Sequence, residues 1–428
     1  MAIIQGLWAR EVLDSRGLPT IECTLWLDTG GIVAASVPTG SSIGKYESVE
    51  IRDQDVNRFL GRGMTKAVQS INSLIAPQIV GKNPTTQQEI DQLLINLDGT
   101  AKKEKLGANA LLAVSQAVLK GGALSVNQPL YYYVHEKYKL SQDLKIPTCI
   151  YTMINGGEHG VNNLDIQEFQ IIAASHLDFS NSLNMAVTMF HQLSQVLAAK
   201  NAIHSVGPVG GFTPNLYNNT DVFELLIETA KTTPYIFSQD FFLGIDAAAS
   251  KFFSGGKYHL RERSEGYSSE ELHEYYKKIY DVFRVLCFED PFREDDEKMW
   301  QQITSELGET SRIVSDLLTA TNPERTQKAI EKKMANTLLV KPNQIGTITE
   351  TAAVIQLAKK AGWQILVSHR SGETNDDLIA DFAVGIGADY VKFGPPNRGE
   401  RIAKYNRLLM IEAELRRSQI DTQSKSVV

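Results

Sequence analysis

Six short apolar runs in the second half of the chain each end in a charged side chain. They cover residues 241–246, 285–289, 313–316, 338–341, 365–370 and 390–392, and they end at Asp246, Glu289, Asp316, Lys341, Arg370 and Lys392. The segments between them have room for a loop and one helix, which is the repeat expected of a barrel of parallel strands. Because the C-terminal ends of such strands meet at one mouth, we expect the six side chains to converge there.

The segments between the runs also carry helix-start signals. Ser268 with Glu271, and Thr347 with Glu350, each fit a capping box ahead of an apolar stripe. Asn322 precedes a proline, which is typical of an N-cap followed by the first helical residue. Strand, capped helix and strand therefore recur, and the pattern predicts an α/β architecture with parallel strands.

The chain is long enough for a second domain. It has 428 residues, of which 43% are hydrophobic, whereas a barrel of this kind needs about 250 residues. The polar stretch 135–145 lacks apolar periodicity and precedes a strand-like run. We therefore expect a small α+β domain over residues 1–135, with a lid loop at 38–48, and the α/β barrel over 146–415. The tail, 416–428, is rich in Gln, Ser and Lys and is expected to be disordered.

Charge and composition exclude several classes of partner. A net charge of −7 without long charge runs argues against a nucleic acid or an anionic membrane. We expect neither a membrane span nor a signal peptide, and thus a cytoplasmic protein. Cys23, Cys149 and Cys287 lie far apart in apolar, strand-like contexts, so we expect buried thiols.

Three of the predicted strand ends carry carboxylates, namely Asp246, Glu289 and Asp316. Oxygen ligands without a neighbouring histidine or thiolate suit Mg²⁺. A single carboxylate in such a place is more simply a helix cap or a lysine partner. Three carboxylates at successive strand ends favour a metal site.

Lys341 and Lys392 end two further runs on the same predicted rim. A lysine close to another cation and a divalent metal can have its pKa lowered enough to act as a base on a carbon-bound proton. A metal on the adjacent carboxylate oxygens of a substrate would stabilise the resulting carbanion. Arg370 with Ser371 suits a phosphate group. For Arg370 and Lys392, a surface salt bridge is the alternative interpretation.

Longer motifs extend over nearly the whole chain. In the barrel they are Glu-Asp-Pro-Phe at 289–292, Lys-Pro-Asn-Gln-Ile-Gly-Thr at 341–347 and Ser-His-Arg-Ser-Gly-Glu-Thr at 368–374. Others lie at 14–17, 97–100, 105–110, 155–159 and 167–169. These motifs resemble those of the enolase family, the phosphopyruvate hydratases. The resemblance implies a small α+β N-terminal domain followed by a modified (β/α)8 barrel. It also implies reversible dehydration of 2-phosphoglycerate, a small phosphorylated hydroxy acid, by a homodimer or higher homo-oligomer.

The resemblance also implies a role for each matching position. Lys341 would remove the C2 proton, and Lys392 would hold the substrate carboxylate. Two Mg²⁺ ions would be bound, the second one completed by Ser42 of the lid. The ligands of the tighter ion would be Asp246, Glu289 and Asp316. The implied substrate-binding set is His159, Gln167, Glu168, Glu289, His369, Arg370, Ser371 and Lys392.

The chain departs from the family pattern at Pro208 and Val209, where an aspartate and a glutamate are usual. That glutamate is the general acid that helps hydroxide to leave C3, and valine has no proton to give. A positioned general acid is typically worth about 10²- to 10⁴-fold in rate. The remaining catalytic candidates are Lys341, Glu168 and His159.

Three hypotheses therefore stay open. The first is a working enolase in which Glu168, Glu158, His159 or a metal-polarised water replaces the missing acid. The second is a degenerate enolase that binds Mg²⁺ and phosphoglycerate, or only exchanges the C2 proton. The third is an enzyme that abstracts an α-proton without elimination, such as an epimerase, for which His159 is the one candidate second base.

The lid sequence also fits another pattern. Residues 40–44, Gly-Ser-Ser-Ile-Gly, match the G-x-S-x-G motif of serine hydrolases. That motif requires a helix directly after the serine, whereas residues 45–53 alternate more like a strand. A flexible lid hinged at its two glycines is the simpler interpretation.

Overall fold

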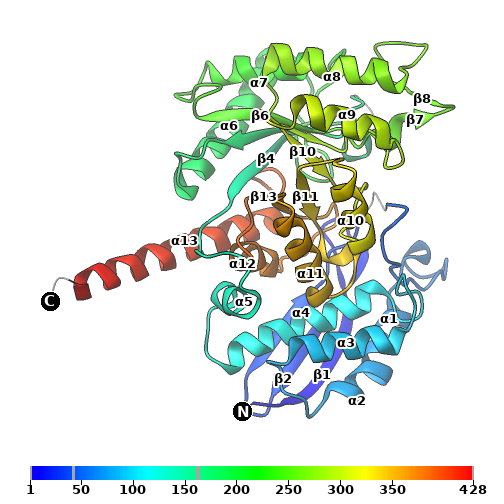
Figure 1. Ribbon diagram of the computed structural model, residues 1–428, viewed down its shortest axis with the longest axis vertical. Coiled ribbons are helices and arrows are strands. Elements are labelled where there is room, and N and C mark those ends of the chain that lie inside the picture. The colour runs from blue at the N-terminus through cyan, green and yellow to red at the C-terminus, as the bar shows by residue number, and fades with distance from the viewer. Residues whose placement is uncertain (1, 41–43, 161–163, 427–428) are drawn as a thin grey trace.

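The computed structural model describes residues 2–40, 44–160 and 164–426. Figure 1 shows two parts, a smaller one built from the N-terminal third and a larger one that contains a barrel. The expected α+β domain followed by a modified α/β barrel is confirmed. The limits that the sequence suggests for the two domains remain predictions.

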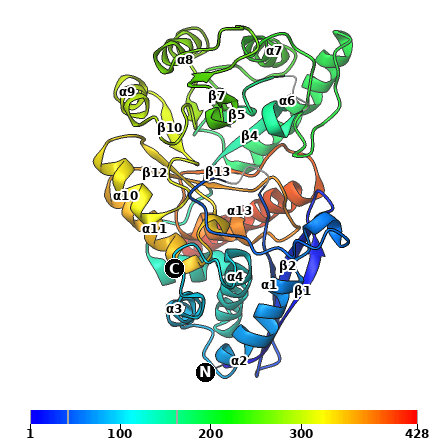
Figure 2. The same ribbon diagram turned by 90° about the vertical axis from the view of Figure 1, so that its right-hand side faces the viewer.

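The N-terminal part holds an antiparallel sheet of three strands. In order across the sheet these are β1 (Ile4–Leu13), β2 (Pro19–Leu27) and β3 (Ile32–Ser36). Alternate residues of β2 are buried, which gives the sheet one face toward the core and one toward solvent. The helices are α1 (Thr65–Ser70), α2 (Ala76–Ile79), α3 (Gln87–Asp98), α4 (Ala108–Ser125) and α5 (Leu130–Tyr138). Figure 2 shows the sheet along one side of this part, with α3 and α4 on its inner side.

The larger part is a closed barrel in which one strand runs against the others. The order around it is β10-β11-β12-β13-β4-β5-β6-β9, and β5 pairs antiparallel with both β4 and β6. The strands are β4 (Thr148–Asn155), β5 (Glu168–Ala173), β6 (Phe241–Asp246), β9 (Cys287–Glu289), β10 (Arg312–Ser315), β11 (Thr337–Val340), β12 (Gln364–Ser368) and β13 (Tyr390–Lys392). Since β5 is reversed, its first residue lies at the end of the barrel where its neighbours finish.

Helices follow most of the strands and surround the barrel. They are α6 (Phe179–Ala199), α7 (Thr220–Ala230), α8 (Ser269–Phe283), α9 (Glu297–Leu307), α10 (Pro323–Glu331), α11 (Ile348–Lys360), α12 (Leu378–Gly385) and α13 (Gly399–Ser426). Ser268 and Glu271 form the predicted capping box. The side chains of Asn322 and Thr347 accept backbone hydrogen bonds as N-caps. These local signals therefore gave the starts of three helices correctly.

Two segments differ from the expectation. Residues 45–53 form no strand, because their backbone N–H groups bond to loops: Ser48 donates to Gln344 O and Val49 to Lys102 O. Helix α13 continues to Ser426 and projects from the body (Figure 1), where the sequence predicts a disordered tail. No glycine or proline follows Gly399, so nothing in the sequence stops the helix.

Two further predictions concern cysteines and membrane spans. Cys23, Cys149 and Cys287 are buried free thiols, as expected. In the part of the chain that the structure describes, no single helix is long and apolar enough to cross a membrane. Helices α4 and α5 together would be long and apolar enough, but the pair is bent by 100° at the break between them.

Candidate active site

The strand ends converge as the sequence predicts. Asp246 of β6 pairs in register with Glu289 of β9, and on its other side with Glu168, the first residue of the reversed strand β5. Asp316 and Lys341 directly follow β10 and β11, and Lys392 ends β13. These ends surround a cavity of about 30 Å³. The predicted site residues that line it are His159, Gln167, Glu168, Asp246, Asp316, Lys341, His369, Arg370, Ser371 and Lys392. Glu289 is fully buried beside Asp246, and Ser42 lies outside the described residues.

Lys392 joins three carboxylates inside the barrel mouth. Its Nζ lies 2.6 Å from Glu289 Oε2, and 3.4 Å from both Asp246 Oδ2 and Glu168 Oε2. Burial alone would lower the pKa of Lys392, but these carboxylates raise it well above its usual range. Lys392 is therefore held as a cation. A permanent cation is suited to binding a carboxylate and is poorly suited to acting as a base.

Lys341 makes a different set of contacts. Its Nζ donates to Asp316 Oδ2, while Gln344 Nε2 donates to the other oxygen of Asp316 at 2.8 Å. Thr321 Oγ1 donates to Gln344 Oε1 and accepts from the backbone N–H of Lys341. The backbone position of Lys341 and the carboxylate of Asp316 are thus fixed by the same small network.

Glu168 and His159 form a hydrogen-bonded pair at the mouth. His159 Nδ1 lies 3.0 Å from Glu168 Oε1, while Thr152 and Gln170 donate to Glu168 Oε2. Burial opposes ionisation of Glu168, but the charge of Lys392 and the bond from His159 hold its pKa well below its usual range. Glu168 is therefore an ionised acceptor, and His159 Nδ1 is the donor of the pair.

Residues 369–371, here called the clamp segment, follow β12. Arg370 Nη1 donates to Glu47 Oε2 at 2.9 Å, and both side chains are buried. Ser371 Oγ accepts from Arg16 Nη1 at 3.3 Å. Backbone bonds between Thr39 and Gly372 tie the start of the lid loop to the end of this segment. Arg370, the cation that we expect to bind phosphate, is thus paired with Glu47, a carboxylate of the lid loop.

The three predicted metal ligands fit Mg²⁺ by chemistry. All three are carboxylates, and Oε1 of Glu289 is buried with no hydrogen-bond partner among the described residues. Burial and the charge of Asp246 raise the pKa of Glu289 well above its usual range, which a divalent cation would reverse. Among the described residues, however, no three His, Cys, Asp or Glu side chains lie close enough to hold a metal as they stand. Lysine ammonium groups bridge these carboxylates instead.

Val209 does not contribute to the cavity. It is buried, and its loop is tied to the segment after β13: Asn397 Nδ2 donates to Gly210 O and Arg398 Nη2 to Gly207 O. Glu158, another candidate for the missing acid, is 43% exposed and pairs with Lys251. Of the candidate acids, His159 and Glu168 line the cavity, and Glu158 does not.

Sequence reasoning missed several residues that support the site. Asp290 accepts from the backbone N–H groups of Asp316 and Leu317, and Glu47 pairs with Arg370. Asp290 and Gln344 lie inside motifs that the resemblance had identified, which was the available signal. Glu47 had no comparable signal, because its partner lies 323 positions away.

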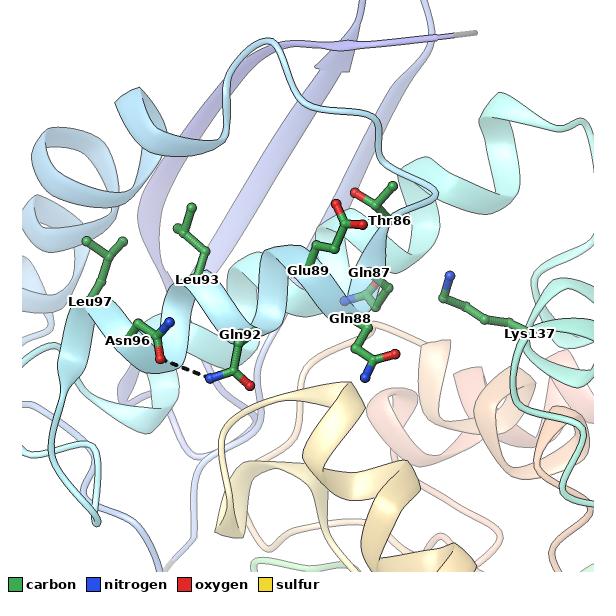
Figure 3. A pocket seen from close by; sticks show the side chains of 9 residues that line it. All are labelled: Thr86, Gln87, Gln88, Glu89, Gln92, Leu93, Asn96, Leu97 and Lys137. Atoms are coloured by element: carbon green, nitrogen blue, oxygen red, sulfur yellow. Dashed lines mark hydrogen bonds between the residues drawn. The ribbon is translucent and has the colours of Figure 1, made fainter.

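A larger groove lies elsewhere. It has a volume of about 860 Å³ and is lined by α3 and by Lys137 of α5. Figure 3 shows Gln88, Gln92 and Asn96 along α3, with Gln92 bonded to Asn96. None of the predicted site residues that the structure describes lines this groove, so its size does not make it the catalytic site.

Both parts of the chain resemble known proteins. The family model described as "Enolase, N-terminal domain" matches residues 4–134, and "Enolase, C-terminal TIM barrel domain" matches residues 143–426. A protein named Enolase from Ehrlichia canis (strain Jake) is 45% identical over 413 residues, which cover 96% of each chain. The Enolase of Ehrlichia ruminantium (strain Welgevonden) is 43% identical over 417 residues, 97% of this chain and 98% of the relative. The matches therefore extend over both domains in their order along the chain.

Proposed function

The chain belongs to the enolase family of hydro-lyases, and we propose that it interconverts 2-phosphoglycerate and phosphoenolpyruvate with Lys341 as the base at C2. The observation that carries this proposal is the convergence of two lysines, the carboxylates of Glu168, Asp246 and Asp316, and the clamp segment on one small cavity. A cavity of about 30 Å³ has room for little more than a water molecule. The substrate therefore enters by replacing contacts that the side chains now make with one another.

Lys341 and Lys392 have different roles at the carboxylate end of the substrate. Lys392, whose pKa is raised by its carboxylates, binds the substrate carboxylate as a cation. Lys341 gives up its bond to Asp316 and takes the proton from C2 at Nζ. Thr321 and Gln344 keep Lys341 and Asp316 in place while this contact is exchanged.

Mg²⁺, in two sites, is part of the proposal. Asp246, Glu289 and Asp316 would hold the tighter ion, and Ser42 would serve the second. When bound, the ions stabilise the negative charge that develops on the substrate carboxylate. The chain's own contribution is an oxygen-only donor set in which Glu289 Oε1 has no partner within residues 2–40, 44–160 and 164–426.

The proton for the departing hydroxide is assigned to His159. Glu168 is held ionised and accepts from Nδ1 of His159, which leaves Nε2 to carry the transferred proton. A carboxylate that fixes an imidazole in this way is a recurrent catalytic arrangement. His159 thus takes the role that Val209 cannot perform.

The setting of the reaction completes the proposal. We place the protein in the cytoplasm, a reducing compartment that suits three free cysteines. We also assign it a homo-oligomeric state, through the solvent-facing side of the N-terminal sheet. Trp8 and Ile32 are exposed on the strands of that sheet.

The direct test is an assay of phosphoenolpyruvate formation from 2-phosphoglycerate with Mg²⁺. We expect turnover that a chelator abolishes and that Lys341→Met removes. Lys298→Met, which alters an exposed lysine of α9 outside the cavity, is the matched control and should retain activity. A chain that binds the substrate but forms no product would instead support the degenerate enolase.

A further inference from the structure

Arg401 is a buried cation directly behind the clamp segment. It lies in the first turn of α13 and is 0% exposed. Its Nη1 lies 2.6 Å from His369 Nδ1 and 2.7 Å from the backbone oxygen of Arg370. Its Nη2 donates to the backbone oxygen of Ser371 at 2.8 Å. One guanidinium therefore contacts all three residues of the clamp segment.

The chemistry of this contact fixes the protonation of the ring. A guanidinium has five N–H donors and no acceptor, and it stays charged in proteins. At 2.6 Å from Arg401, Nδ1 of His369 has to be an acceptor without a proton. A neutral imidazole with an unprotonated Nδ1 carries its proton on Nε2. The ring lines the cavity, and among the described residues none forms a hydrogen bond with Nε2.

The other groups around the ring do not reverse this assignment. Burial and the charge of Arg401 hold the pKa of His369 well below its usual range. Glu168 of β5 favours protonation of the ring, whereas Lys392 of β13 and His159 oppose it. Gly394 packs against the ring so closely that an added Cβ would lie 2.9 Å from Cε1. The ring is therefore confined on one side by backbone and on another by a cation.

We propose that Arg401 is a positioning residue that holds His369 as the neutral, Nε2-protonated tautomer, so that His369 donates a hydrogen bond to the substrate phosphate. His369 then takes no part in proton transfer, which separates its role from that of His159. The choice of ligand rests on the proposed function. The tautomer rests on the geometry of Arg401 alone.

Lys404 provides a matched control for a merely structural role. It is also fully buried, one turn further along α13. Its Nζ donates to the backbone oxygens of Thr374 and Asp376 and pairs with Glu373. Lys404 thus stabilises the chain just after the clamp segment without contacting His369.

The test is ¹⁵N NMR of the full chain labelled at histidine, without metal or substrate. The His369 signal is assigned by its loss in His369→Gln. We expect an unprotonated Nδ1 and a protonated Nε2 that persist between about pH 5.5 and 8, where an ordinary histidine titrates. A proton on Nδ1, or on both nitrogens at neutral pH, would overturn the proposal.

Two variants distinguish an effect on the orientation of the His369 ring from an effect on folding. In Arg401→Met the ring should become a mixture of tautomers that titrates, while Lys404→Met should leave it unchanged. Equal changes in both variants, or no change in Arg401→Met, would contradict the assignment. Thermal unfolding checks that each variant folds. If Arg401→Met does not fold, the measurement on the unaltered chain decides the matter.

Inorganic phosphate tests the ligand. Its addition should shift the Nε2 signal of the unaltered chain. Arg401→Met should bind phosphate about tenfold more weakly, the loss expected for one hydrogen bond to a charged group. A phosphate titration that leaves Nε2 unchanged would refute the ligand assignment. Because this experiment needs no turnover, an absence of phosphoenolpyruvate formation would count against the proposed function and leave the result for Arg401 intact.

Discussion

At the scale of single residues, Val209 and His159 decide which group can donate a proton to the departing hydroxide. Val209 is buried in a loop held by Asn397 and Arg398, and it does not line the cavity. His159 lines the cavity and is held at Nδ1 by an ionised Glu168. His159 is therefore the proton donor that we propose at the mouth, in place of the acid that the family resemblance leads us to expect at Val209.

We predict that His159→Gln uncouples the two halves of the reaction. Glutamine can occupy the space of the imidazole but cannot exchange a proton, so dehydration should fall by at least about 10²-fold. Exchange of the C2 proton by Lys341 should persist, as measured by deuterium uptake in heavy water. Glu158→Gln, which changes an exposed neighbour, is the control and should leave both rates near those of the unaltered chain. Parallel loss of exchange and dehydration in His159→Gln would argue for a structural role.

Strand-end reasoning found most of the site residues but not Glu168. Asp246, Glu289, Asp316 and Lys341 follow from their places at or after the C-terminal ends of parallel strands. Glu168 begins its strand, and only the antiparallel course of β5 brings it to the mouth. No periodicity in the sequence reveals strand direction, so the resemblance alone identified this residue.

At the scale of elements, the lid and the clamp segment are joined by the pair of Glu47 and Arg370. Glu47 Oε2 accepts from Arg370 Nη1, and its Oε1 accepts from the backbone N–H of Gly44. A substrate phosphate that binds Arg370 has to compete with this carboxylate. When phosphate binds Arg370, it therefore replaces Glu47, and the contact between the lid and the clamp segment is released.

We predict that Glu47→Gln strengthens phosphate binding. The amide keeps the size of the side chain and an acceptor for Gly44 but removes the charge that faces Arg370. Inorganic phosphate should bind about tenfold more tightly by calorimetry, and the chain should unfold at a lower temperature because a buried ion pair has lost one partner. Glu270→Gln, which breaks the exposed pair with Lys298, is the control and should change neither quantity appreciably. Weaker phosphate binding in Glu47→Gln would contradict this account of the lid.

The carboxylate of Glu306 on α9 accepts hydrogen bonds from side chains of α8, and it makes the stability of the fold depend on pH. Burial alone would raise the pKa of Glu306, but hydrogen bonds from Gln302, His273 and Lys277 lower it to about 2. An unfolded glutamate has a pKa of about 4.3, so the ionised form is favoured by folding. The contribution of Glu306 is complete above the unfolded value and is lost as the pH falls from about 4.3 to about 2.

Glu306→Gln should therefore lower the melting temperature at neutral pH. The difference from the unaltered chain should shrink as the pH falls through this window, in thermal unfolding followed by circular dichroism. Glu309→Gln, an exposed change just after α9, is the control. A difference that stays constant down to about pH 2 would show that the three hydrogen bonds do not favour the ionised form.

Helix starts were predictable where a side chain caps the backbone locally, as at Ser268, Asn322 and Thr347. Two other features were not. The course of residues 45–53 depends on loops distant in sequence, and Arg401 contacts carbonyl groups some 30 positions away. Contacts of this kind leave no local pattern in the sequence, so only the folded chain reveals them.

At the scale of the whole molecule, the solvent-facing side of the N-terminal sheet is the proposed contact between copies. Trp8 is 49% exposed and Ile32 is 61% exposed, which is unusual for large apolar side chains on regular strands. We predict that Trp8→Glu shifts the oligomer to monomer in sedimentation velocity, because a charge would be buried at the contact. Val282→Glu changes an apolar side chain on α8 that is 69% exposed, and it should leave the oligomer intact. The same mass for both variants would place the contact elsewhere.

We propose that the chain completes dehydration although it has a valine at position 209, where the family resemblance leads us to expect the general acid. The most direct measurement follows 2-phosphoglycerate in heavy water with Mg²⁺ and records phosphoenolpyruvate formation and deuterium uptake at C2 together, beside a Pro208→Asp, Val209→Glu double variant. We expect product from the unaltered chain and no gain in the double variant. Deuterium uptake without product, with product restored in the double variant, would contradict it.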